Sequence, residues 1–239
     1  MQLLDLTLRT PEQNLACDEA LFNLCEEGGS HEVLRFWEPR DYFVVLGYSN
    51  KRATEANENS CRADGVPILR RCTGGGTVLQ GPGCLNYTLV LRIGSRPELE
   101  NVTSTNCFIM EQNRAALQPL VGEKIEIEGF TDLAIAGRKF SGNAQRRGKQ
   151  FILFHGSFLL DFDLAKIERY LSTPSRQPAY RSNRSHEDFL MNLPFAAKEA
   201  RGLLMEAWQT TNIVRDVPMS SVQRLSEQKY ARVEWNLKF

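Results

Sequence analysis

The chain has 239 residues, 42% of them hydrophobic, so it can form one large domain with a substantial core and needs neither disulfides nor a structural metal. Lysine plus arginine and aspartate plus glutamate both total 29, which excludes a global basic surface for nucleic acid. No apolar run is long enough to cross a bilayer, and Asp5 lies where a secretory signal would be basic or apolar. We therefore expect a cytoplasmic protein with no nucleic-acid partner and no membrane partner.

The elements expected from hydrophobic periodicity follow one another in an order typical of mixed α+β proteins. The first part is expected to hold strands at 3–8, 32–37, 42–46 and 67–71 and helices at 11–27 and 54–63. The middle part is expected to hold strands at 85–93, 123–127, 132–136 and 151–160 and a helix at 105–120. The last part is expected to hold helices at 163–171, 194–209 and 220–232, with a Pro/Ser/Arg-rich stretch at 172–188. We predict an α+β fold with mixed or antiparallel β-sheets and flanking helices.

Six cysteines lie scattered along the chain without a C-x-x-C pair, and the three histidines are far apart. This spacing argues against a zinc site. Most of the thiols are expected to be buried small hydrophobic groups in a reducing compartment. One catalytic thiol remains open as an alternative.

Two arginines followed by three glycines form the first segment with chemical character, Arg70-Arg71-Cys72-Thr73-Gly74-Gly75-Gly76-Thr77-Val78-Leu79. Consecutive glycines weaken a sheet but allow positive φ and a close approach of backbone to a ligand. Free N–H groups beside fixed cations describe a pocket for a phosphate or a carboxylate. The alternative is a flexible hairpin flanked by solvated arginines. The segment matches neither a P-loop nor G-x-G-x-x-G.

A second cationic segment runs from Asp132 to Gln145. A turn at Gly137 presents Arg138 and Lys139, and Gly142 is a second point of conformational freedom. Taken alone, the segment is more typical of a surface hairpin with exposed cations. Both segments supply cations and glycine at strand ends, and this favours a shared site.

The two segments resemble signatures of the lipoate–protein ligase A family, in the biotin/lipoate protein ligase superfamily. R-R-x-[ST]-G-G-G-x-V is matched by residues 70–78 and G-R-K-x-S-G-x-A by residues 137–144. The family's first helix and its H-G-[ST] strand are matched, in the same order, by residues 14–21 and 154–160. The resemblance implies a catalytic domain of the class II synthetase/biotin-ligase type.

The resemblance also implies a reaction. ATP and Mg²⁺ would convert lipoate to lipoyl-AMP, and the acyl group would pass to a lysine of a lipoyl carrier domain, such as an E2 subunit or a glycine-cleavage H-like protein. Lys139 is the implied catalytic residue. The implied contacts to ATP or lipoyl-AMP are Arg70, Arg71, Gly74, Gly75, Gly76, Thr77, Val78, Leu79, Asp132 and Lys139. The implied substrate contacts are Asn86, Gly137, Ser141, Gly142 and His155.

Some of these assignments have alternatives. Asp132 is a candidate Mg²⁺ ligand, although Thr131 replaces the first residue of the family's polar pair. His155 could contact substrate, but a lone histidine on an apolar strand is more often a hydrogen-bonded core residue. Gln80 stands where many relatives have His, and it can exchange hydrogen bonds but cannot titrate. An apolar channel for the acyl tail is expected along the alternating residues of 85–93 or 151–160.

Residues 1–239 are expected to form one catalytic domain without the family's C-terminal accessory domain. Either a separate polypeptide supplies that domain, or the chain performs only part of the reaction. The nearest alternative function is an octanoyl or lipoyl transferase, which holds the acyl group on a cysteine near the lysine. Residues 123–131, where one related class has that cysteine, contain none. A non-catalytic protein that binds a lipoyl carrier is the third alternative, and lipoate and octanoate both fit as the acid.

Overall fold

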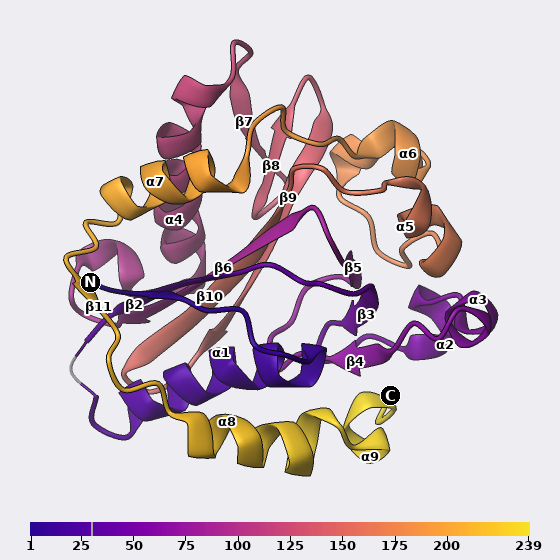
Figure 1. Ribbon diagram of the computed structural model, residues 1–239. Helices are drawn as coiled ribbons and strands as arrows, with labels where there is room; N and C mark the ends of the chain where they lie inside the picture. Colours follow the sequence, from indigo (N-terminus) through magenta and orange to yellow (C-terminus); the bar gives the residue numbers. More distant parts are fainter. Residues whose placement is uncertain (30) are drawn as a thin grey trace.

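The computed structural model describes residues 1–29 and 31–239, which form two β-sheets with helices packed outside them (Figure 1). The strands are β1 (Gln2–Asp5), β2 (Val33–Trp37), β3 (Phe43–Leu46), β4 (Ile68–Arg70), β5 (Val78–Gln80), β6 (Cys84–Arg92), β7 (Ile125–Glu128), β8 (Asp132–Ile135), β9 (Arg138–Arg147), β10 (Phe151–Leu159) and β11 (Asn212–Ile213). The helices are α1 (Pro11–Glu26), α2 (Arg52–Glu55), α3 (Glu58–Ala63), α4 (Val102–Leu117), α5 (Ala165–Tyr170), α6 (His186–Phe189), α7 (Ala197–Ala207), α8 (Met219–Leu225) and α9 (Val233–Asn236), with the π-helical turn η4 (Ser226–Tyr230) between α8 and α9.

The strand order is β11-β1-β2-β6-β10-β9-β8-β7 in the large sheet and β4-β3-β5 in the small sheet. In the large sheet β1 runs parallel to β2 and β11, and the other neighbours are antiparallel. In the small sheet β3 is parallel to β4 and antiparallel to β5. The predicted α+β class with mixed sheets and flanking helices is confirmed.

Helices cover the two faces of the large sheet differently, with α4 and α7 on one side and α1 and α8 on the other (Figure 1). The apolar row that the sequence predicts is buried beneath α4 and α7 from Leu85 to Leu91, together with Phe154 and Phe158 of β10, whereas Ile93 is only partly buried. These side chains are packed core, whose density leaves no room for an acyl tail. The expectation of an acyl channel along this face is therefore not supported.

Helix α1 begins where the sequence predicts, because Thr10 and Gln13 form a capping box. The Thr10 hydroxyl accepts from the Gln13 amide, and the Gln13 side chain accepts from the Thr10 amide, both at 3.3 Å. Pro11 occupies the first helical position, where its missing N–H costs nothing. The helix then buries Asp18 and Glu19, two carboxylates that face the large sheet and the C-terminal helices.

The main difference from the expected elements is β9, which occupies the polar segment 137–149 to which the sequence pattern assigned no strand. The short strands β5 and β11 were also not expected. The expected helix at 54–63 is divided into α2 and α3, because Ala56 adopts an extended conformation and Asn57 caps α3.

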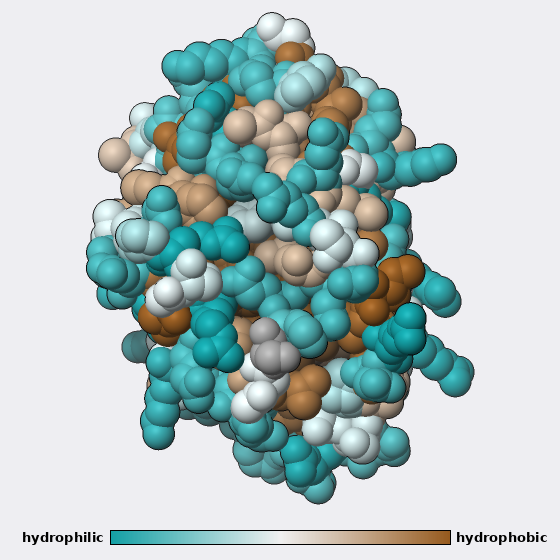
Figure 2. All heavy atoms as spheres, turned by 90° about the vertical axis from the view of Figure 1, so that its left-hand side faces the viewer, coloured by the Kyte–Doolittle hydropathy of each residue, from teal (hydrophilic) through white to brown (hydrophobic). Residues whose placement is uncertain are grey.

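The face at the left of Figure 1 is largely hydrophilic, with hydrophobic atoms scattered between polar side chains (Figure 2). None of the helices formed by residues 1–29 and 31–239 combines the length and apolar character that a bilayer span requires.

Candidate active site

The three glycines form an exposed bend between β4 and β5. Gly75 has φ +85°, a conformation that favours glycine. A Cβ atom added at Gly74 or Gly76 would meet no other atom within 4 Å. The flanking residue Thr73 is buried, and its carbonyl accepts from the Tyr48 amide at 2.8 Å. The bend therefore exposes its backbone to a ligand while its base is fixed to the small sheet.

Arg71 holds this bend from the inside. Its Nη2 donates to the carbonyls of Gly74 and Gly76, and its Nε donates to Thr73 Oγ1 at 3.0 Å. Burial lowers the pKa of the guanidinium to about 10, so the group stays charged at neutral pH. The structure thus places a fixed positive charge directly beneath the glycines.

Arg70 points away from the bend, which corrects its expected role as a nucleotide contact. Its guanidinium donates to the carbonyls of Gly47, Tyr48 and Asn50 and to two backbone carbonyls of α9, and it has no exposed surface. Successive residues of a strand face opposite sides, so only one of the adjacent arginines can face the bend. Arg70 clamps the C-terminal segment to the small sheet.

The β8–β9 hairpin presents the candidate catalytic lysine. Ala136 and Gly137 both have positive φ, as a tight two-residue hairpin turn requires. Lys139 Nζ forms an ion pair with Asp132 Oδ1 at 2.8 Å, with side chains 25% and 14% exposed. A Cβ atom at Gly142 would lie 2.8 Å from Nζ, so glycine at this position leaves the space that the ammonium occupies.

The two segments converge on one face of β9. A Cβ atom at Gly75 would lie 3.3 Å from Ala144 Cβ, and Gly142, beside the Lys139 ammonium, is two residues away on the same face. Two residues of a strand span about 7 Å. The glycine bend and the Lys139 ammonium therefore lie against the same face of β9, about two strand residues apart.

The remaining expected contacts surround this point. Thr77 and Val78 are half-buried, and Leu79 and Ser141 are buried. Asn86 and Gln80 form a closed hydrogen-bonded ring with Ser157: Asn86 Nδ2 donates to Gln80 Oε1 at 2.9 Å, and Gln80 Nε2 donates to Ser157 Oγ at 2.7 Å. Gln80, in the place of the relatives' His, therefore has a structural role that needs no titration.

His155 takes part in a buried polar chain that sequence reasoning only partly anticipated. Its Nε2 lies 2.7 Å from Thr73 Oγ1 and its Nδ1 lies 3.3 Å from Asp18 Oδ2. Asp18 in turn pairs with the fully buried Arg35 of β2. Burial alone would raise the pKa of Asp18, but Arg35 and His155 outweigh burial and lower it. The chain joins the base of the glycine bend to α1 and β2, so it supports the bend from below.

Asp132 does not sit in a metal cage. Lys139 occupies one carboxylate oxygen, and the other accepts from the Tyr180 hydroxyl at 2.8 Å. Within residues 1–29 and 31–239, no group of three His, Cys, Asp or Glu side chains is arranged to hold a metal. The surroundings of Asp132 therefore do not fit a resident metal centre.

Sequence reasoning missed Tyr180, Asn143 and Gly47 at the site. Tyr180 is 48 residues from Asp132. Asn143 exchanges hydrogen bonds with Thr131 across the hairpin, and a Cβ atom at Gly47 would lie 2.1 Å from the Gly75 carbonyl oxygen. Of these three residues, only Gly47 had a signal in the sequence, because a glycine directly follows the strand expected at 42–46.

The family model described as "Lipoyl protein ligase A/B catalytic domain" matches residues 10–201. The chain belongs to this family. The expected family membership is confirmed.

The proteins similar to this chain carry two kinds of name, lipoate–protein ligase and octanoyltransferase. "Probable lipoate-protein ligase A" of Mycoplasma pneumoniae is 30% identical over 162 residues, which are 68% of this chain and 46% of that protein. "Octanoyltransferase LipM" of Lysinibacillus sphaericus is 27% identical and is matched over 96% of this chain and 95% of its own length. The chain thus spans about half of the first relative and nearly all of the second.

Solved lipoate–protein ligases share the fold. A lipoate-protein ligase A bound with ATP superposes with a TM-score of 0.82 at 24% identity, with 99% of each chain covered. The bi-partite ligase of Thermoplasma acidophilum, described with its E2 lipoyl domain, superposes with a TM-score of 0.81 at 24% identity, with 99% of this chain and 96% of that chain covered.

Proposed function

We propose that the protein is an ATP-dependent lipoate–protein ligase. Lipoate would be activated to lipoyl-AMP, and the acyl group would pass to a lysine of a lipoyl carrier domain. An E2 subunit or a glycine-cleavage H-like protein fits this carrier role, and the T. acidophilum neighbour is described with an E2 lipoyl domain. The expected cytoplasmic location belongs to the same proposal.

The observation that carries the proposal is the position of Lys139 beside the glycine bend. Attack of a carboxylate on an α-phosphate brings two anions together, and a fixed cation between them lowers the barrier electrostatically. Lys139 Nζ pairs with one carboxylate oxygen of Asp132 at 2.8 Å, and an ammonium has three N–H donors. The ammonium can therefore also bind carboxylate and phosphate oxygens, while the exposed backbone of Gly74–Gly76 offers amides to the nucleotide.

In the second step the same cation acts on a different group. When the carrier lysine attacks the mixed anhydride, negative charge develops on the acyl carbonyl oxygen and then on the departing phosphate of AMP. The same Lys139 ammonium would stabilise both charges in turn. ATP brings its own Mg²⁺ on its phosphates, in keeping with the preference of this ion for phosphate and water oxygens over protein cages.

The distribution of thiols supports a ligase over a transferase. Cys72 and Cys84 flank the glycine bend, but both are buried, and burial raises their pKa values to about 11 and about 12. Cys107 is exposed on α4, which covers the opposite face of the large sheet. A thioester intermediate needs a reachable thiolate near the lysine, and none of the six thiols meets this requirement.

An octanoyltransferase is the second candidate, favoured by the full-length match to LipM. It predicts acyl transfer from a donor carrier without nucleotide. Lipoate-dependent exchange of pyrophosphate into ATP separates the two functions. We expect exchange in the wild-type protein, whereas nucleotide-free transfer that stops in Cys→Ser variants would establish the transferase.

Lys139→Ala is expected to lower pyrophosphate exchange by at least about a hundredfold, because loss of a preorganised charge contact costs about 3 kcal/mol or more in the transition state. Lys149→Ala removes an exposed lysine at the far end of β9 and serves as the matched control. Equal activity in the two variants would remove Lys139 from the mechanism. The assays are run with and without a candidate accessory polypeptide, because the proposed enzyme would be bi-partite like that of T. acidophilum.

A further inference from the structure

The carboxylate that pairs with Lys139 is held by a hydrogen bond from a distant part of the chain. Tyr180, in the short helical turn Ala179–Arg181, donates its hydroxyl to Asp132 Oδ2 at 2.8 Å, while Oδ1 holds Lys139 Nζ at 2.8 Å. Burial and the neighbouring Asp132 raise the pKa of the Tyr180 hydroxyl, so it keeps the proton that it donates. Both oxygens of Asp132 thus have a fixed partner.

The segment that carries Tyr180 is fastened to the lysine's own turn. Arg184 Nη2 donates to the Gly137 carbonyl at 2.9 Å, and the Met191 amide donates to the Lys139 carbonyl at 3.0 Å. These contacts fasten the segment that follows the tyrosine to the start of β9. The position of the Tyr180 hydroxyl is therefore determined together with that of Lys139.

The backbone of Asp132 is already fixed by other contacts. Thr131 Oγ1 donates to the Asn143 carbonyl at 3.0 Å, and Asn143 Nδ2 donates to the Thr131 carbonyl at 2.7 Å. What remains free is rotation of the carboxylate about its own axis, a soft torsion with broad preferences. In the part of the chain that the structure describes, Tyr180 is the one side chain besides Lys139 that contacts this carboxylate.

We propose that Tyr180 is a positioning residue that directs Lys139 through Asp132, an inference that rests on the proposed ligase function. With Oδ2 tied to Tyr180, Oδ1 is held toward the Lys139 ammonium, with which it forms an ion pair. The ammonium is then held at the place where the two anionic reactants meet. Lysine has a flexible four-carbon side chain. Its ammonium therefore keeps one position only while the carboxylate with which it pairs is itself held in place.

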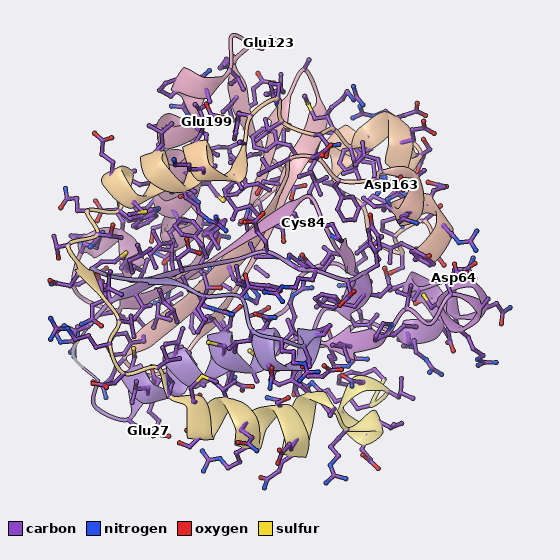
Figure 3. The ribbon with its side chains drawn as sticks, in the orientation of Figure 1. Glu27, Asp64, Cys84, Glu123, Asp163 and Glu199 are labelled. Carbon is purple, nitrogen blue, oxygen red and sulfur yellow. The ribbon has the colours of Figure 1, made fainter. Side chains whose placement is uncertain are left out.

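A matched arrangement elsewhere in the chain supplies the control. Tyr170 donates to Asp64 Oδ2 at 2.9 Å, and Asp64 Oδ1 accepts from Arg169 at 3.0 Å. This is the same tyrosine–carboxylate–cation chemistry, but Asp64 lies at the outer end of α3, away from β9 (Figure 3). Tyr170→Phe therefore removes an equivalent hydrogen bond without touching the Lys139 site.

The experiment compares Tyr180→Phe with Tyr170→Phe in lipoate-dependent pyrophosphate exchange. We expect kcat to fall about tenfold or more in Tyr180→Phe, because misplacement of a catalytic group by about 1 Å can cost up to a hundredfold. KM for ATP and lipoate should change by less than about threefold, since the contact matters in the transition state. Tyr170→Phe should keep the wild-type kcat, with similar thermal midpoints for both variants. Equal kcat values in the two variants would overturn the proposal.

A double-mutant cycle tests whether the effect passes through Asp132. If it does, Tyr180→Phe combined with Asp132→Asn is no slower than Asp132→Asn alone, whereas losses that multiply would overturn the inference. The two proposals fail on different results. Absence of lipoate-dependent exchange in the wild-type protein defeats the proposed ligase function. With exchange present, an active Lys139→Ala variant, or an inactive one beside an unaffected Tyr180→Phe, defeats this inference alone. If the wild-type protein transfers acyl groups without nucleotide, the same kcat comparison is made on that transfer.

Discussion

Gly142 illustrates how the site depends on a missing side chain. A Cβ atom there would lie 2.8 Å from the Lys139 ammonium and 2.9 Å from its Cε, both at the far end of a flexible side chain. Gly142→Ala is therefore expected to displace the ammonium while the fold adapts. We predict that kcat for pyrophosphate exchange falls by about 10- to 100-fold, the cost typical of a misplaced catalytic group.

Gly202→Ala is the control for this substitution. Gly202 lies within α7 with open space around it, so alanine should stabilise the protein by up to about 1 kcal/mol and leave kcat unchanged. Thermal unfolding and steady-state exchange are measured on both variants. A Gly142→Ala protein with normal kcat would show that the ammonium does not need its observed position.

Single residues also show where sequence reasoning ends. The glycine bend and Lys139 could be predicted, because consecutive glycines and cations at strand ends are visible in the sequence. The different tasks of Arg70 and Arg71 could not, since the partners of Arg70 come from the turn after β3 and from α9, more than 160 residues away in the second case. Tyr180 lies in a Pro/Ser/Arg-rich stretch whose composition carries no sign of a contact with Asp132.

At the scale of elements, α1 is joined to the large sheet through a buried charge. Asp18 pairs with Arg35 of β2, which is fully buried, and contacts His155 of β10. Because removal of one partner leaves a buried charge uncompensated, Asp18→Asn should destabilise the protein by about 3–5 kcal/mol at neutral pH. Urea unfolding measures this difference, and Asp163→Asn, at a half-exposed surface carboxylate, should change stability by less than about 1 kcal/mol.

The pH dependence of the same pair has a definite sign. The pKa of Asp18 lies below its ordinary value of 3.8, despite the opposing effect of burial, because of Arg35 and His155. The unfolded chain therefore binds the proton first as pH falls. The stabilisation is fully present above pH 3.8 and is lost below that value, as the folded-state pKa is passed. Wild-type stability should fall more steeply below pH 3.8 than that of Asp18→Asn, and parallel curves would contradict the assignment.

Among the strands, β9 shows why the pattern of apolar residues was insufficient. Successive side chains of β9 point to opposite faces of the sheet, as in any strand, but both faces carry polar side chains with polar partners. Gln145 reaches Asn106 of α4 on one face, and Arg146 reaches Glu19 of α1 on the other. Polar residues on both faces obscure the apolar period of a strand, whereas β6 and β10, which form the core, were predicted within about one residue.

At the scale of the whole molecule, the accessibility of the thiols bears on the proposed choice between ligase and transferase. Five cysteines are buried and Cys107 alone is exposed, and Figure 3 shows Cys84 in the interior among packed side chains. Burial raises the pKa values of Cys17 and Cys25 to about 11 as well, so these groups are neither reachable nor ionised at neutral pH.

Brief treatment of the native protein with iodoacetamide is therefore expected to alkylate Cys107 and no other thiol, with full retention of pyrophosphate exchange. Mass spectrometry of the intact protein counts the label, and Cys107→Ser should take up none while keeping wild-type activity. A transferase must instead expose a thiolate beside Lys139 during turnover. An acyl thioester on Cys72 or Cys84 after incubation with an octanoyl donor, or inactivation by alkylation that the donor prevents, would mean that the closed packing around the glycine bend opens in solution and that acyl transfer proceeds through a cysteine.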